Sequence, residues 1–129
     1  MKWVSYCELW RSEGFPSMAE QRGVLAKGLA RRAATYLDDG VCERWMYAGV
    51  TADVFDRTRC VPLGWCSDGT WVWPKALAHY VREHQVGLPE ALLDHMRAQD
   101  FVAPECSEAE VREQIRRIRV TVHQRARRG

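Results

Sequence analysis

The clearest pattern of apolar and polar positions lies in residues 64–73, where two runs rich in aromatic and apolar residues flank Asp68-Gly69. Asp-Gly between such runs is typical of a two-residue β-hairpin loop, because a type I′ turn needs positive φ at both central residues. The sequence therefore predicts a hairpin here. Its expected cross-strand pairs are Ser67 with Thr70, Cys66 with Trp71, Trp65 with Val72 and Gly64 with Trp73.

Side chains alternate between the two faces of a strand, so this hairpin carries a tryptophan on each face. Trp71 and Trp73 fall on one face, and Trp65 and Val72 fall on the other. The ribbon is therefore either covered on both sides or exposes one aromatic face.

Helical patterns lie on both sides of the hairpin. Ser17 and Glu20 have the spacing of a capping box, and the apolar stripe that follows predicts a helix to about Leu37. Pro74 and Pro89 can each open a further helix, since proline fits the first helical position. A second capping box at residues 107–110 starts the last helix. Its apolar residues are Val111, Ile115, Ile118 and Val122.

The remaining segments look extended or irregular. Residues 45–48 are expected to form a strand, and Val61-Pro62 indicates an edge strand because proline has no amide hydrogen to donate. Residues 3–10 fit either a short strand or one helical turn. With no internal repeat and no linker, residues 1–129 are predicted to form a single α+β domain. It would combine a small antiparallel sheet of about three strands, centred on the hairpin, with about four helices.

Composition narrows the class of protein. Of 129 residues, 47% are hydrophobic, which is enough for one core. No apolar run approaches the roughly 20 residues of a membrane helix, and the N-terminus lacks the apolar stretch of a secretory signal. The five cysteines contain no Cys-x-x-Cys pair, so reduced, mostly buried thiols are expected, with one reactive cysteine as the alternative. We therefore predict a cytoplasmic protein with no metal and no cofactor.

Candidate catalytic residues are few. His79 and Glu83 are four residues apart and share a helix face, where a carboxylate could orient an imidazole for general-base chemistry. The alternative is a solvated pair, and His84 lies on the apolar stripe as expected for a structural histidine. Cys66 stands near the hairpin tip as a candidate nucleophile, although no known catalytic motif surrounds it. The sequence does not decide whether the protein is an enzyme.

Two surfaces are candidates for binding. Trp65, Trp71 and Trp73 would form a ligand or partner surface if one face of the hairpin is open, and otherwise belong to the core.

The last helix is basic, with seven arginines against one acid from residue 112 onward. This arrangement could neutralise phosphates, but it is also typical of a solvated helix face. The same helix packs on its own domain or forms a homodimer, because its apolar seam is too short to specify a coiled coil. The candidate phosphate-binding residues are Arg112, Arg116, Arg119 and Arg127.

Residues 67–74 (SDGTWVWP), 77–81 (LAHYV) and 86–89 (VGLP) resemble a segment of small uncharacterised actinobacterial (Streptomyces-like) proteins. Similar segments occur in small proteins from bacterial immunity-type neighbourhoods. The resemblance implies a hairpin followed by a helix and a cytosolic actinobacterial protein, and it carries no catalytic residues.

Three functions follow as hypotheses. The first is a small binding or regulatory protein of the immunity or accessory type that acts through a protein partner. The second is nucleic-acid binding through the last helix. The third is a small enzyme of specialised metabolism, with a pocket near Trp71 and Trp73 and either His79 or a cysteine as its reactive group.

Overall fold

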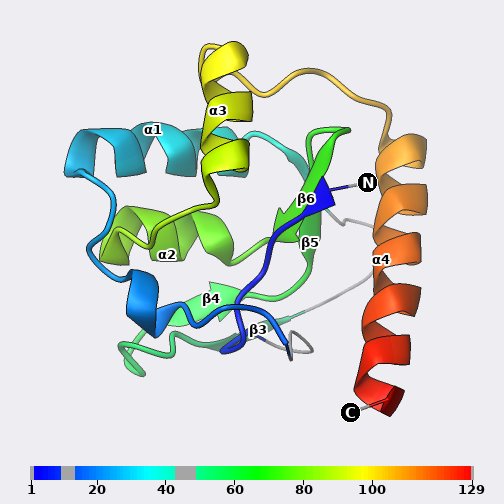
Figure 1. Cartoon of the computed structure of the whole chain (residues 1–129), viewed down its shortest axis with the longest axis horizontal. Helices are drawn as coiled ribbons and strands as arrows, with labels where there is room; N and C mark the ends of the chain where they lie inside the picture. The colour runs from blue at the N-terminus through cyan, green and yellow to red at the C-terminus, as the bar shows by residue number, and fades with distance from the viewer. Residues whose placement is uncertain (1, 10–13, 43–48, 129) are drawn as a thin grey trace.

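The computed structural model describes residues 2–9, 14–42 and 49–128, with side chains up to residue 118. It confirms an α+β fold (Figure 1). No helix in the described segments combines the length and apolarity needed to cross a bilayer. The elements are β1 (Lys2–Trp3), the 3₁₀ helix η1 (Ala19–Gln21), α1 (Lys27–Asp38), β2 (Val41–Cys42), β3 (Val50–Ala52), β4 (Cys60–Pro62), β5 (Trp65–Ser67), β6 (Trp71–Pro74), α2 (Leu77–His84), α3 (Glu90–Ala98) and α4 (Glu108–Arg128).

The strands form two sheets instead of one. The larger sheet has the order β1-β6-β5-β2, and β3 pairs with β4 in a separate antiparallel hairpin. Within the larger sheet β1 runs parallel to β6, which corrects the expectation of a purely antiparallel sheet of about three strands. This pairing joins the N-terminus to a strand almost 70 residues later, so no local pattern could predict it. The strand expected at residues 45–48 lies outside the described residues.

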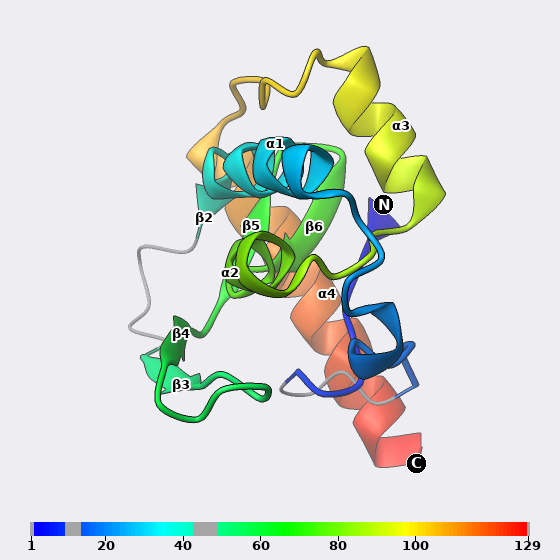
Figure 2. The same cartoon turned by 90° about the vertical axis from the view of Figure 1, so that its left-hand side faces the viewer.

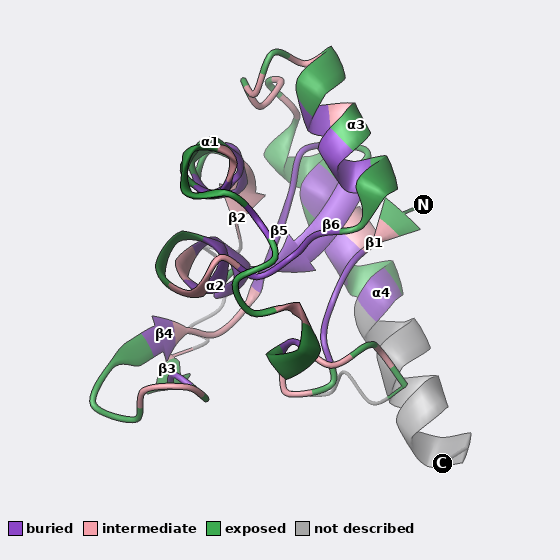
Figure 3. Ribbon diagram, turned by 60° about the vertical axis from the view of Figure 1, so that its left-hand side comes forward, coloured by how far each residue is buried: buried purple, intermediate pink, exposed green. Residues whose placement is uncertain are grey.

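Helices cover both faces of the larger sheet (Figure 3). The face that carries Trp71 and Trp73 packs against apolar side chains of α1, α2 and α3, whereas Trp65 and Val72 on the other face pack against α4. The predicted assignment of the tryptophans to opposite faces is therefore confirmed. The apolar seam of α4 lies on its own chain, through Val111, Ile115 and Ile118.

The hairpin register differs from the prediction by two residues. Ser67 pairs with Val72 and Cys66 with Trp73, so the loop is wider than the two residues Asp68 and Gly69. The cause is the Asp68 side chain, whose Oδ1 accepts hydrogen bonds from the amides of Thr70 and Trp71. A shift of two residues keeps every side chain on its face, which is why the face assignment survives.

The predicted helix over residues 17–37 is interrupted. Only η1 forms near the predicted start, and α1 begins at Lys27, after Gly23 adopts a positive φ of 72°. The predicted capping box of Ser17 and Glu20 is also wrong. Glu8 instead accepts hydrogen bonds from the amides of Met18 and Ala19, each at 2.6 Å. Burial alone would raise the pKa of Glu8, but these hydrogen bonds lower it to about 2.

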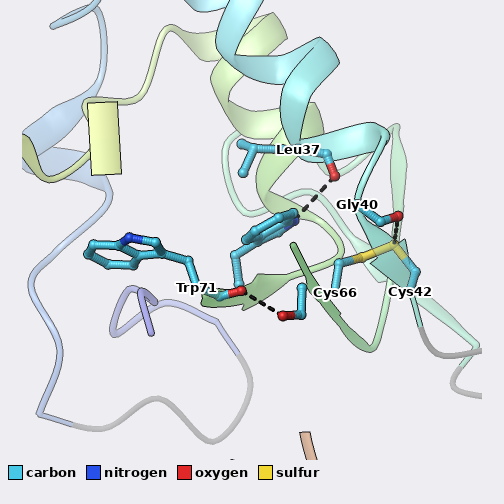
Figure 4. The surroundings of a disulfide bond; sticks show 7 residues. Leu37, Gly40, Cys42, Cys66 and Trp71 are labelled. Atoms are coloured by element: carbon cyan, nitrogen blue, oxygen red, sulfur yellow. Dashed lines mark hydrogen bonds between the residues drawn. A yellow bond between two sulfur atoms is a disulfide. The ribbon is translucent and has the colours of Figure 1, made fainter. Parts of the chain in front are cut away.

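A disulfide joins Cys42 of β2 to Cys66 of β5 (Figure 4). It contradicts the prediction of reduced thiols for these two residues and removes Cys66 as a nucleophile. Both residues are directly opposite each other in the β2–β5 pair. Register, and not spacing along the chain, therefore decides which cysteines meet. Cys7, Cys60 and Cys106 are free thiols.

Candidate functional site: an aspartate and two histidines

The site begins with Asp53, the first residue after β3. Its amide donates to the Arg59 carbonyl at 2.9 Å, which extends the β3–β4 pairing by one step. Its Oδ1 accepts hydrogen bonds from the amides of Phe55 (2.7 Å) and Asp56 (3.2 Å), so the side chain caps the loop between the two strands. The side chain is completely buried, and the loop lies beneath α2 in Figure 2. These bonds leave Oδ2 to face α2.

Helix α2 supplies two histidines to this oxygen. The Nε2 atom of His79 lies 2.6 Å from Asp53 Oδ2, and the Nε2 atom of His84 lies 2.9 Å from the same atom. The two histidines are five residues apart, about 140° around an ideal helix, so they do not share a helix face. They converge because His84 is the last residue of α2 and Asp53 lies between them. Their side chains are 22% and 11% exposed, so solvent reaches part of both imidazoles.

Aromatic packing fixes the imidazole rings. Phe55 meets the ring of His84 edge-on at 5.0 Å, and Tyr80 meets the ring of His79 edge-on at 5.4 Å. The Tyr80 hydroxyl also accepts a hydrogen bond from the amide of Val54, which holds the loop against α2. The two residues that follow Asp53 therefore contact the helix that carries the histidines.

The charge of the site is set by Asp53. Burial alone would raise the pKa of its carboxyl group, but hydrogen bonds with His79 and His84 hold that pKa well below its usual range. The carboxylate is therefore ionised, and each imidazole donates its Nε2 hydrogen to it. In chemical terms the site is one buried carboxylate and two imidazoles, with all three potential ligand atoms within 4.8 Å of one another.

Glu83 does not pair with His79, which corrects the sequence-based hypothesis. Its Oε2 lies 3.0 Å from Nη1 of Arg59, a residue of the loop that Asp53 opens. The hydrogen bond from Arg59 lowers the pKa of Glu83. Of the three candidate catalytic residues, the structure thus brings His79 and Glu83 to one region, while Cys66 lies in the disulfide.

The sequence predicts neither Asp53 as a site residue nor the contact that His84 makes with it. His84 was expected to be structural because it lies on the apolar stripe, and nothing in the sequence marks Asp53, which reads as an ordinary turn residue. A five-residue histidine spacing is likewise no helical signature. The set exists only because the β3–β4 hairpin folds back under α2.

A second buried aspartate has a related but smaller set of partners. Oδ2 of Asp68 accepts hydrogen bonds from the Tyr36 hydroxyl and from His95, whose Nε2 lies 2.8 Å away. Its Oδ1 caps the hairpin turn, as described above. This network ties α1, the hairpin and α3 together with one histidine instead of two.

The predicted aromatic surface is not exposed. Trp65, Trp71 and Trp73 are 7%, 6% and 0% exposed, respectively. The physical reason is that α4 covers one face of the hairpin while α1, α2 and α3 cover the other. The structure therefore corrects the expectation of an open tryptophan face.

The described arginines of the basic helix are exposed, whereas its apolar seam is buried against the sheet. Arg112 and Arg116 are both exposed, and Arg116 pairs with Glu113 at 2.7 Å. The side chains of Arg119 and Arg127 lie outside the described residues. Nucleic-acid binding by this helix stays a prediction.

Comparison with protein-family models, with curated proteins and with solved structures finds no match to this chain. The resemblance to small actinobacterial proteins therefore also stays a prediction, and the functional argument rests on the site itself.

Proposed function

We propose that this chain binds a divalent transition-metal ion through Asp53, His79 and His84. The observation that carries the proposal is the convergence of two imidazole Nε2 atoms on one oxygen of a buried carboxylate. A carboxylate fully enclosed by protein is costly unless it is compensated, and a bound cation is one way to compensate it.

The distances suit a metal centre. Ligand atoms about 2.0–2.2 Å from a tetrahedral zinc ion lie roughly 3.3–3.6 Å apart, and those of an octahedral ion lie roughly 3 Å apart. The separations from Asp53 Oδ2 to the Nε2 atoms of His79 and His84, 2.6 and 2.9 Å, need to open by only a few tenths of an ångström to about 1 Å, and all three ligand atoms already lie within 4.8 Å of one another. Metal binding would require each neutral imidazole to carry its hydrogen on Nδ1 instead of Nε2, so that the Nε2 lone pair could bind the ion.

The types of donor atom favour particular metals. Two imidazoles and one carboxylate suit zinc, iron(II), cobalt or manganese, whereas magnesium and calcium prefer oxygen ligands alone. Three protein ligands leave at least one coordination position for water or a substrate, as in catalytic centres. The partial exposure of both histidines supports an open position that solvent can reach.

The hydrogen bonds that hold Asp53 resemble those that hold the carboxylate ligands of metal centres. Metal-binding carboxylates are usually held by further hydrogen bonds, and Oδ1 of Asp53 receives two from backbone amides. This arrangement leaves Oδ2 as the single ligand oxygen. Of the hypotheses from sequence, a small enzyme with His79 as a reactive group is nearest to this proposal, while binding to a protein partner stays a prediction.

The test is titration of the metal-free full-length chain with cobalt(II), followed by its visible absorption and by calorimetry. We expect one ion per chain, with no absorption band from sulfur ligands. His84→Ala should weaken binding by more than about 100-fold, because changes outside the ligand shell already cost about 10- to 100-fold. His95→Ala is the matched control, since His95 also contacts a buried aspartate but belongs to no such set.

Three results would contradict the proposal: no cobalt uptake by the wild type, equal cobalt affinity for the wild type and His84→Ala, or equal loss in His84→Ala and His95→Ala. In each case the contact between Asp53 and the histidines would only tie the loop to α2.

A further inference from the structure

Arg59 lies beside the proposed metal centre because the loop between β3 and β4 starts at Asp53 and ends at Arg59. The Arg59 carbonyl accepts the amide hydrogen of Asp53, so the two residues are neighbours across the base of the loop. The Arg59 side chain then crosses to α2 and contacts Glu83. A guanidinium group is thus held at the edge of a site that contains one carboxylate and two imidazoles.

Both members of this ion pair are direct neighbours of residues of the site. Glu83 precedes His84 on α2, and the Arg59 carbonyl accepts the amide hydrogen of Asp53 at 2.9 Å. Glu83 is nevertheless outside the group of atoms that could share one ion, so it is a neighbour of the centre and not a ligand.

The pairing between Arg59 and Glu83 is easily exchanged. The side chains are 49% and 38% exposed, and ion pairs in water of this kind contribute little. Guanidinium groups form two parallel hydrogen bonds with phosphate or carboxylate oxygens. Moreover, a divalent ion bound by one carboxylate and two neutral imidazoles keeps a net positive charge and an open position.

We infer that Arg59 makes this centre a binding site for small oxyanions, with the Glu83 carboxylate occupying the guanidinium until a phosphate- or carboxylate-bearing ligand replaces it. Such a ligand would occupy the open position of the metal centre and accept hydrogen bonds from Arg59. This inference rests on the proposed metal function, and it adds the chemical class of the ligand.

The experiment uses the full-length chain loaded with cobalt(II), titrated with inorganic phosphate or with acetate at constant ionic strength in chloride. The visible cobalt spectrum reports the entry of an oxygen ligand. A response to phosphate alone identifies phosphate-bearing ligands, and a response to acetate alone identifies carboxylates; either supports the inference.

Three variants make the test specific. Arg59→Gln should weaken anion binding about 10-fold or more, the equivalent of one charge-assisted hydrogen bond, while cobalt affinity changes little. Glu83→Gln should strengthen anion binding, because it removes the competing carboxylate. Arg57→Gln is the matched control, an exposed arginine of the same loop, and should bind anions as the wild type does.

The outcomes separate the two proposals. Cobalt uptake with anion binding that is unchanged in Arg59→Gln, or with no spectral response to either anion, overturns this inference and leaves the metal proposal standing. A chain that takes up no cobalt at the site overturns both.

Discussion

Gly40 lies where the end of α1 approaches the central sheet, and its replacement by alanine should be strongly destabilising. A Cβ atom at this position would lie 2.4 Å from Cζ2 and 2.9 Å from Cη2 of Trp73, and 3.1 Å from the Ser67 carbonyl oxygen. The Trp73 indole donates a hydrogen bond to the carbonyl of Leu37, which is labelled with Gly40 in Figure 4. An ordinary contact needs about 3.4 Å or more, so the ring or the backbone would have to move by about 1 Å.

Trp73 has no room to make that movement. Its side chain is 0% exposed, and its indole nitrogen is hydrogen-bonded to the backbone at the end of α1. Inserting a methyl group into a filled core typically costs about 1–3 kcal/mol, and the rigid surroundings place this site toward the upper end. The lower entropy of the unfolded alanine chain offsets about 0.5 kcal/mol of it. We therefore expect Gly40→Ala to lose about 2 kcal/mol.

The measurement is equilibrium unfolding in urea, with Gly28→Ala as the matched control. Gly28 lies inside α1 with nothing within 4 Å of an added Cβ, so alanine there should stabilise the chain by about 0.5–1 kcal/mol. The two midpoints should move in opposite directions and differ by about 1 M or more. A Gly40→Ala variant as stable as Gly28→Ala would refute the close packing of Trp73 against residue 40.

Three further predictions concern single contacts. Reduction of the Cys42–Cys66 disulfide, which spans 24 residues, should cost about 3 kcal/mol of unfolding free energy through the freed loop, measured by urea unfolding with and without reductant. Glu8→Gln should cost about 1–3 kcal/mol at neutral pH. Because the folded pKa of Glu8 is depressed from 4.5 to about 2, its contribution is complete above 4.5 and is lost as pH falls through that range, so the two unfolding curves should converge in acid. Ile115→Ala should cost about 2–5 kcal/mol, measured by thermal unfolding, because this side chain is 1% exposed between α4 and the sheet; a neutral effect would mean that α4 does not pack there.

The contact between Asp53 and the two histidines is the feature of the candidate site that the sequence could not predict. Asp53 looks like a turn residue and behaves as one, since its Oδ1 caps the loop. That its other oxygen meets His79 and His84 depends on a contact between a hairpin and a helix that begin more than 20 residues apart. No periodicity reports such a contact, because the intervening chain sets the distance between the two elements.

The sequence by itself determined features that depend on neighbouring residues. The period of two placed Trp71 and Trp73 opposite Trp65, and this assignment held although the register was shifted by two residues. The helical period likewise identified Ile115 as part of the packed face of α4. In each case a local repeat decides which side of an element is apolar, and burial of that side then follows.

Only the tertiary structure decided which distant segments meet. The parallel pairing of β1 with β6, the Glu8 carboxylate on the amides of Met18 and Ala19, the Cys42–Cys66 disulfide and the histidines around Asp53 all join residues well separated along the chain. Such contacts form when the packing of whole elements fixes distances and register. The residue types alone do not identify them, because the same types occur in ordinary turns, helix caps and buried thiols. The covered tryptophan faces have the same origin, because the pattern required partners for both faces and the packing of four helices supplied them.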